Sequence, residues 1–261
     1  YLTDIARDDD DIRGAILYGS RADADIPPDP YQDFDVYFIT MDPERFDISV
    51  FTDVCLSFIP SEVYPDLFPG EICHLMLFGD DTRIDLPLGN LETYRETHAR
   101  GGPRKILLDK DGALAELPEP DPGETRLKPI DDRTFAHTCA EFFWETQNMA
   151  KGLLREELSY AMFIRDVSMR DMLHRMIDTA IGLRTGFAVA VRTLGRFRKH
   201  YLTKEEYASY RATYAANTEE DVWDSLYTML AMFGRLGRQV AAQCRYSYPE
   251  EDETFVRSYL R

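Results

Sequence analysis

Residues 15–40, AILYGSRADADIPPDPYQDFDVYFIT, contain two apolar segments separated by a loop with three prolines. Residues 14–18 and 34–40 have the β-branched and aromatic composition that is typical of strands. Gly19 and Ser20 follow the first strand, where a Gly-Ser step allows a sharp turn and exposes backbone N–H groups and a hydroxyl to an anion. A plain turn would have the same sequence, so the meaning of this step depends on the residues that follow.

Asp33 and Asp35 stand at the beginning of the second strand. Because successive side chains of a strand alternate, both carboxylates point to one face, with their backbones about 7 Å apart. Two like charges side by side are unfavourable unless water or a cation separates them, and Mg²⁺ prefers such hard oxygen ligands. The pair indicates a magnesium site, although a solvated strand end would show the same residues.

Asp85 lies inside the otherwise apolar segment 83–88, RIDLPL. Burying an unpaired carboxylate is costly, so Asp85 needs a partner. One candidate is Arg83 or another basic side chain. The other is the metal site of Asp33 and Asp35, which Asp85 would join if the two strands are neighbours.

The order of these pieces is more specific than any one of them. A strand followed by Gly-Ser, a strand beginning Asp-x-Asp and a strand with one central Asp resemble the nucleotidyltransferase pattern shared with DNA polymerase β. In that pattern two metal ions, bridged by the carboxylates, hold a nucleoside triphosphate and activate the attacking hydroxyl. Phosphoryl transfer depends mainly on positioning and charge neutralisation, so little else is needed from the protein.

The segments around this motif predict an α/β domain with a mixed sheet over residues 1–117. The expected strands are 14–18, 34–40, 72–78, 83–88 and 105–108, and the expected helices are 91–100 and a segment before Ile12. The segment 118–129, PEPDPGETRLKP, contains four prolines and cannot form a regular helix or a central strand. It is therefore expected to link the first domain to a second one.

Residues 130–261 predict an all-α domain, because apolar residues recur there at three- and four-residue steps. The periodic segments are 135–158, 171–194, 204–214 and 218–244. Thr203 and Glu206 have the spacing of a capping box at the start of one helix. These patterns predict a bundle of four to six helices.

The composition is that of a globular protein with a strong negative charge. The 261 residues are 44% hydrophobic, and 47 acidic against 30 basic residues give a net charge of −17. Nucleic-acid binding needs clustered Lys and Arg, so no nucleic-acid partner is expected, whereas an acidic cleft would concentrate a cationic substrate. The same charge would also keep a cytosolic protein in solution. No apolar run is long enough for a membrane span, and four cysteines without metal-ligand spacing predict a cytoplasmic protein.

The chain resembles the aminoglycoside 6-adenylyltransferases, the enzymes that modify streptomycin and so cause antibiotic resistance. The matching segments are 15–40, LMLFGDDTRIDLPL at 75–88, KILLDKDGAL at 105–114 and EFFWETQNMAKGLLREELSYA at 141–161. The resemblance implies a polymerase-β-like catalytic domain joined to a helical domain, with ATP and the drug in the cleft between them. It also implies AMP transfer from Mg-ATP to the 6-hydroxyl of streptomycin. Residues 43–71 depart from the family pattern.

By motif position, the resemblance also implies residue roles. The expected catalytic residues and ligands of two Mg²⁺ ions are Asp33, Asp35 and Asp85, with Asp85 as the candidate general base. The expected nucleotide-binding residues are Gly19, Ser20, Arg21 and Lys151. ATP and a cationic small molecule are the expected partners of a monomeric protein.

Three residues of the helix 135–158 are expected to bind the acceptor. Glu141 and Glu145 stand four residues apart, so they share a helix face and repel each other unless a cation lies over them. A guanidinium-bearing aminoglycoside would serve, and so would Lys151 or solvent. Trp144 fits both core packing and a surface on which adenine or the acceptor stacks.

Two other functions fit the same motifs. One keeps the chemistry but changes the acceptor, to another small molecule or to a protein side chain. The other is a nucleotide-binding or antitoxin-like protein without turnover. The intact acidic triad argues against the second, because such a protein has no need for three repelling carboxylates.

Overall fold

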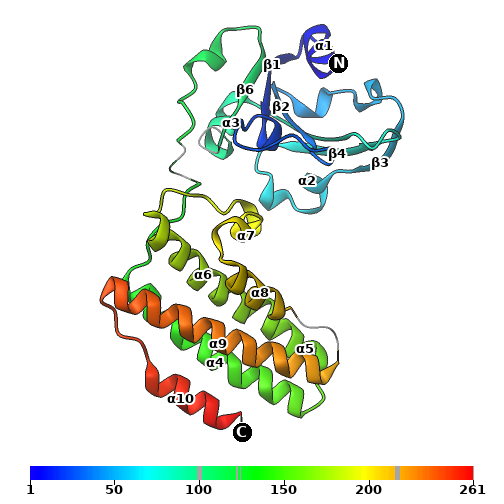
Figure 1. The fold of residues 1–261 in the computed structure, drawn as a ribbon. Coiled ribbons are helices and arrows are strands. Elements are labelled where there is room, and N and C mark those ends of the chain that lie inside the picture. The colour runs from blue at the N-terminus through cyan, green and yellow to red at the C-terminus, as the bar shows by residue number, and fades with distance from the viewer. Residues whose placement is uncertain (99–101, 122, 124, 215–217, 261) are drawn as a thin grey trace. The chain divides into compact units, whose positions relative to one another are not determined.

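The computed structural model describes residues 1–98, 102–121, 123, 125–214 and 218–260 (Figure 1). The chain divides into two compact units, Tyr1–Thr125 and Arg126–Arg261. The division falls within the proline-rich segment 118–129. In the described residues, no helix is both long and apolar enough to cross a membrane.

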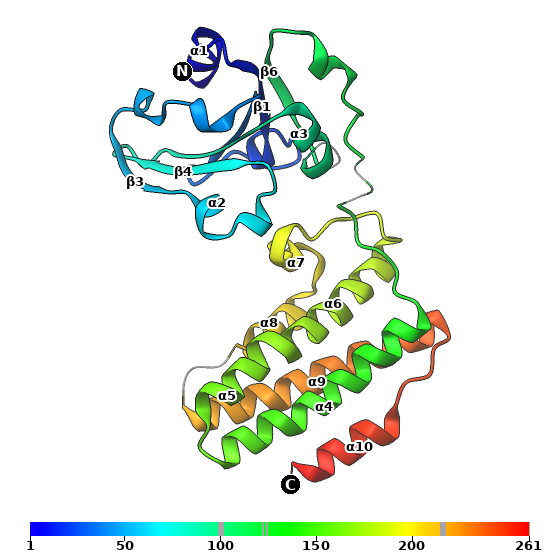
Figure 2. The same ribbon diagram turned by 180° about the vertical axis from the view of Figure 1, so that it is seen from behind.

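The first unit is a mixed six-stranded sheet with short helices (Figures 1 and 2). Its strands are β1 (Ile12–Tyr18), β2 (Phe34–Thr40), β3 (Val54–Phe58), β4 (Ile72–Phe78), β5 (Arg83–Gly89) and β6 (Lys105–Asp109). Its α-helices are α1 (Leu2–Asp8), α2 (Pro60–Val63) and α3 (Leu91–Thr97). Its 3₁₀ helices are Gly19–Arg21, Pro43–Arg45, Ile48–Val50, Pro65–Leu67 and Ala113–Glu116.

The strand order is β3-β4-β5-β2-β1-β6. Only the β2–β5 pair is parallel among these neighbours, and the other pairs are antiparallel. The predicted mixed sheet is therefore confirmed. The parallel pair joins β2, which contains Asp35 and directly follows Asp33, to β5, which contains Asp85.

The two faces of the sheet pack against different apolar clusters because the side chains of each strand alternate. Val36 and Phe38 of β2 belong to one buried cluster, together with Leu86 of β5. Tyr37 and Ile39 belong to the cluster on the opposite face. Asp33 and Asp35 have the same parity as Tyr37, so their side chains lie on the Tyr37 face.

Two details of this unit differ from the sequence prediction. Strand β3 was not predicted, because it is an edge strand whose residues from Cys55 to Phe58 are exposed and show no inside–outside alternation. The helix predicted over 91–100 ends at Thr97. Residues 99 and 100 lie outside the described part of the chain.

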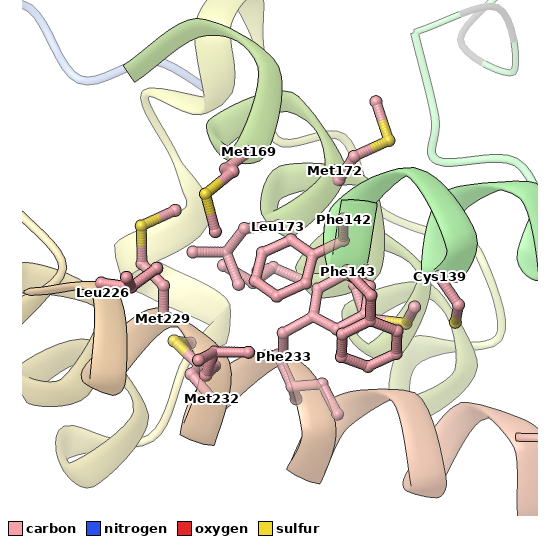
Figure 3. Packing of buried hydrophobic residues seen from close by; sticks show 14 of the residues in the cluster. Cys139, Phe142, Phe143, Met169, Met172, Leu173, Leu226, Met229, Met232 and Phe233 are labelled. Carbon is pink, nitrogen blue, oxygen red and sulfur yellow. The ribbon is translucent and has the colours of Figure 1, made fainter. Parts of the chain in front are cut away.

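The second unit is helical. Its α-helices are α4 (Asp132–Leu154), α5 (Leu158–Phe163), α6 (Arg170–Thr185), α7 (Arg198–Tyr201), α8 (Lys204–Ala212), α9 (Glu219–Cys244) and α10 (Glu250–Tyr259). A π-helical segment, Ile164–Met169, joins α5 to α6, and Thr193–Gly195 forms a 3₁₀ helix. Helices α4, α6 and α9 pack against one another. Figure 3 shows their core, in which the rings of Phe142 and Phe233 stack with centroids 3.8 Å apart.

The capping box at Thr203 and Glu206 is confirmed. The helix predicted over 171–194 is too long, because α6 ends at Thr185. Gly186 adopts a left-handed backbone conformation (φ 60°) and the N–H of Phe187 donates to the carbonyl of Gly182 at 2.7 Å. This geometry closes a helix, and glycine adopts it without steric cost.

The prediction of four to six helices was also wrong, since the described part of this unit contains seven α-helices. Helix α10 was not predicted. The helix is attached to the rest of the unit through the buried side chain of Glu253, which is 3% exposed. Glu253 accepts hydrogen bonds from Arg238 at 2.8 Å, from Arg257 at 2.7 Å and from the Tyr248 hydroxyl at 2.6 Å. A Cβ atom at Gly234 would lie 2.7 Å from the Glu253 carboxylate, so glycine at this position lets Glu253 pack directly against α9.

Candidate active site

Asp33, Asp35 and Asp85 form a compact group of carboxylates on the first unit. Asp35 and Asp85 are register partners on the parallel strands β2 and β5, and Asp33 directly precedes β2. One carboxylate oxygen from each residue can be chosen so that all three lie within 4.8 Å of one another. The structure thus brings together the three residues that the strand pattern singles out. Three converging oxygen donors are a set that a hard divalent cation such as Mg²⁺ accepts.

Gly19 leaves the space in which the Asp35 carboxylate lies. Gly19 adopts a positive φ of 68° at the end of β1, and a Cβ atom built there would lie 2.0 Å from the Asp35 carboxylate. No other residue combines that backbone conformation with that free space. The Gly-Ser step is therefore more than a plain turn, because it lets a carboxylate lie directly against the backbone.

Arg83 is the basic partner of the triad. Its Nε and Nη2 atoms donate to the two carboxylate oxygens of Asp85 at 2.8 and 2.7 Å, and Nε lies 3.9 Å from Asp33. The hydrogen bonds to Asp85 raise the pKa of Arg83, and the charges of Asp85, Asp33 and Asp35 add to this effect. Of the two partners expected for Asp85, Arg83 is the one observed, and the other two carboxylates of the candidate metal site lie beside it.

Arg21 lies beneath the loop that leads into β2. Its Nε donates to the carbonyl of Asp33 at 2.9 Å and its Nη2 to the carbonyl of Gln32 at 2.7 Å. The guanidinium carbon is 3.8 Å from the centroid of the Phe34 ring. Arg21 therefore fixes the backbone that carries Asp33. Ser20 is half-buried in the same 3₁₀ helix, and the role of both residues at the nucleotide phosphates remains a prediction.

Sequence reasoning missed the polar residues that lie behind the triad on the same sheet face. Tyr18 is the register partner of Asp35 across β1 and β2, and its ring packs edge-on against His98. Burial raises the pKa of Tyr18, and the nearby charge of Asp35 raises it further. Tyr18 therefore stays a neutral phenol beside the carboxylates. Its signal in the sequence was its place immediately before Gly19.

Glu71 is buried in this layer. It accepts hydrogen bonds from Thr97 at 2.8 Å and Tyr37 at 3.1 Å, and His98 Nδ1 lies 3.4 Å away. Burial alone would raise the pKa of Glu71, but the contacts from His98, Thr97 and Tyr37 outweigh it and lower the value. The network anchors α3 to the sheet behind the triad.

The predicted residues of the second unit lie on α4 and divide into two groups. Trp144 is 68% exposed, so it is not a core residue, and it lines a cavity together with Lys151. Lys151 donates to Asn148 at 3.1 Å. Glu141 and Glu145 do not line that cavity: Glu141 lies 3.5 Å from His137, and Glu145 accepts a hydrogen bond from Asn148 at 3.3 Å.

A family model described as streptomycin adenylyltransferase matches residues 1–261. This chain belongs to the streptomycin adenylyltransferase family. An aminoglycoside 6-adenylyltransferase of Campylobacter jejuni is 32% identical over 268 residues, covering 100% of this chain and 92% of the relative. One from Bacillus subtilis is 30% identical over 264 residues, covering 97% and 92%, and one from Staphylococcus aureus is 28% identical over 270 residues, covering 98% and 95%.

A crystal structure of an aminoglycoside 6-adenyltransferase from Bacillus subtilis has the same fold. It superimposes with a TM-score of 0.50 at 24% identity, covering 99% of this chain and 94% of that one. The two-part architecture is thus that of the streptomycin adenylyltransferase family. The chain is an aminoglycoside 6-adenylyltransferase-like nucleotidyltransferase, and its acidic triad is consistent with metal-dependent nucleotidyl transfer.

Proposed function

We propose that this protein transfers AMP from Mg-ATP to a hydroxyl group of an aminoglycoside, the 6-hydroxyl of streptomycin, and thereby causes resistance to the drug. The observation that carries the proposal is the convergence of Asp33, Asp35 and Asp85 at the β2–β5 pair. The substrate class comes from the relatives, which are named as aminoglycoside 6-adenylyltransferases.

The three carboxylates are the proposed ligands of two Mg²⁺ ions. Bound there, Mg²⁺ would polarise the α-phosphate and lower the pKa of the attacking hydroxyl. With Arg83 in place, the three aspartates and one guanidinium carry a net charge of minus two. That charge suits one divalent cation, and movement of Arg83 away from Asp85 would leave minus three for a second ion and the triphosphate.

The chain's own residues would position the reactants. Gly19 and Arg21 hold Asp35 and the Asp33 backbone in place, while Ser20 and Arg21 are the proposed contacts of the phosphates. Asp85 is the proposed general base, and release of its two bonds to Arg83 would make its carboxylate a stronger acceptor for the proton of the acceptor hydroxyl. Arg83, once released, is a cation available to the departing pyrophosphate.

The division of labour in the chain follows the same proposal. Residues 1–117 would form the catalytic domain, 118–129 the linker, and 130–261 the domain that supplies Lys151 to the triphosphate, Trp144 to the acceptor, and the negative charge of Glu141 and Glu145 to its surroundings. The four cysteines are all free thiols, which fits the reducing cytoplasm where ATP is available.

The direct test is mass spectrometry of streptomycin and a panel of other aminoglycosides after incubation with the protein, ATP and MgCl₂. A mass gain of one AMP unit on streptomycin is the expected result, and fragmentation of the product should locate it on the 6-hydroxyl. A gain on another compound alone would keep the reaction and change the acceptor. Binding of ATP without modification of any compound would favour the non-catalytic alternative.

A further inference from the structure

A cavity of about 660 Å³ lies between α4 and α10, which are side by side in the second unit (Figures 1 and 2). Its walls include Trp144, Asn148 and Lys151 from α4 and Asp252, Phe255 and Tyr259 from α10. The α4 residues follow steps of four and three, and the α10 residues follow steps of three and four. Each set therefore lies on one face of its helix.

The cavity wall is rich in exposed aromatic rings. Trp144 and Phe255 are 68% and 69% exposed, and Tyr259 is 48% exposed. Three large rings that line one cavity on two helices are unusual on the surface of a water-exposed helix pair, where apolar residues occur singly. Their flat faces suit a planar or ring-shaped ligand, and their π-electrons attract a cation.

The cavity wall carries both signs of charge. Asp252 belongs to the first turn of α10, and Lys151 belongs to the last turn of α4. The Lys151 ammonium donates to Asn148 at 3.1 Å, so it has a partner on its own helix. Asp252 is the acidic side chain of this wall.

The acidic wall is held rigidly. Asp252 directly precedes Glu253, whose carboxylate is buried and bonded to Arg238, Arg257 and Tyr248. Val256, also buried, fixes the next turn of α10 against the helical core. The groups that would meet a ligand are thus mounted on a helix that is anchored by buried residues next to them, as a preformed binding site requires.

We propose that this cavity binds a guanidinium or ammonium group of the aminoglycoside acceptor, against the ring of Trp144 and paired with the carboxylate of Asp252. This inference rests on the proposed function and adds α10 to the specificity-determining elements. An adenine ring would stack on the same aromatic residues, but it offers no positive charge to Asp252. A cationic ring satisfies both the aromatic faces and the carboxylate.

The two tryptophans of the chain, Trp144 and Trp223, make the proposal measurable by fluorescence. In a Trp223→Phe background, Trp144 is the single indole, and streptomycin titrated without ATP should change its emission. Asp252→Asn should raise the dissociation constant for streptomycin about tenfold, the usual loss for one charge-assisted hydrogen bond. The matched control is Glu251→Gln, which removes the same charge from an exposed neighbour outside the cavity and should leave the constant unchanged.

Steady-state kinetics give the second measurement. Asp252→Asn should raise KM for the acceptor about tenfold while kcat and KM for ATP stay unchanged, as loss of ground-state binding requires. Equal behaviour of Asp252→Asn and Glu251→Gln would overturn the inference, as would a response of Trp144 to ATP and not to streptomycin. Failure of the proposed function has a different signature: streptomycin would bind in the Asp252-dependent manner but would gain no AMP.

Discussion

The polar groups of the carboxylate triad on the sheet and those of the α4–α10 cavity in the helical unit are held in place in different ways. In the sheet, backbone register puts Asp35 opposite Asp85, and Gly19 removes the atom that would stand in the way. In the helical unit, a buried side chain, Glu253, holds α10 so that Asp252 and Phe255 line the cavity beside α4. In the sheet, the backbone sets the positions of the carboxylates, so substitutions elsewhere change the site little. On a helix face, each substitution of a wall residue changes the shape or charge of the cavity directly. The comparison suggests a fixed reaction and an adaptable acceptor.

The strongest way to test the sheet side of this comparison is to neutralise the triad. Asp33→Asn, Asp35→Asn and Asp85→Asn each remove one charge from the proposed metal site without changing side-chain volume, and each should lower kcat about a thousandfold or more. Circular dichroism should show that the variants remain folded. Near-normal turnover by any one of them would remove that residue from the site.

Gly19→Ala should cause the next largest loss of activity. The added Cβ meets the Asp35 carboxylate and the backbone has a positive φ, so Asp35 must move and activity should fall about a hundredfold. Gly112→Ala is the matched control, since Gly112 has a similar φ of 71° but no atom within 4 Å of a new Cβ. Gly112→Ala should lose about 1 kcal/mol of stability and keep its activity. Gly19→Ala should lose more stability, because its Cβ also meets Asp35, and it should lose activity as well. Equal activities would show that Gly19 serves only as a turn.

On the helical side, Glu253→Gln breaks the anchor of α10. It removes a buried carboxylate from Arg238 and Arg257, which are roughly half exposed, so we expect unfolding to become easier by about 2 kcal/mol. Thermal melts measure this change. Glu250→Gln, which loses an exposed bond to the same Arg238, should cost well under 1 kcal/mol. A Glu253→Gln variant as stable as Glu250→Gln would mean that apolar packing alone holds α10.

Arg83→Gln sharpens the account of the metal site. At the proposed metal site, Arg83 and a divalent cation would compete for Asp85, so the substitution should tighten Mg²⁺ binding about threefold to tenfold without nucleotide. Isothermal titration of Mg²⁺ measures the constant. Arg45→Gln, which breaks the exposed pair with Asp11, changes the net charge equally and should have no effect. Weaker Mg²⁺ binding in Arg83→Gln would show that Arg83 supports the ligands instead of competing with the ion.

The smallest expected effect belongs to Glu141→Gln combined with Glu145→Gln. Both residues are on α4 but outside the cavity, with His137 and Asn148 as their partners. They act on a cationic acceptor only through their distant charge, so KM for the acceptor should rise about twofold and KM for ATP should not change. An effect larger than that of Asp252→Asn would move the acceptor site from the α4–α10 cavity to the Glu141 face.

What the sequence predicted was local in character. Strand alternation put Asp33 and Asp35 on one face, and the capping-box spacing placed Thr203 at a helix start, because both depend on residues a few positions apart. The end of α6 had a readable signal in Gly186 that a purely apolar pattern overlooked. The exposure of Trp144 had no signal in the sequence, because the helical period does not show which face of α4 another helix covers.

The contacts that the sequence did not predict join distant segments. Glu253 meets Arg238 across the turn between α9 and α10, and Tyr37 meets Glu71 from a different strand region. Nothing in the sequence near Glu253 distinguishes it from its exposed neighbours Glu250 and Glu251. From the sequence, all three would be predicted to be solvated acidic residues. The absence of a side chain at Gly234 marks the surface on which Glu253 of α10 packs, and Gly237 makes room for the ring of Tyr248. Both meanings appear only once the helices are assembled.

The pairing of Arg83 with Asp85 has a consequence for the newly made protein. Because the guanidinium comes from the same strand as the carboxylate, the chain brings its own counterion to the place where negative charge gathers. The charges gathered at the β2–β5 pair are therefore partly offset by the chain itself, without a bound cation. If the site holds Mg²⁺ as proposed, protein made while the ion is scarce should fold and then become active when the ion is restored, with no need for new translation.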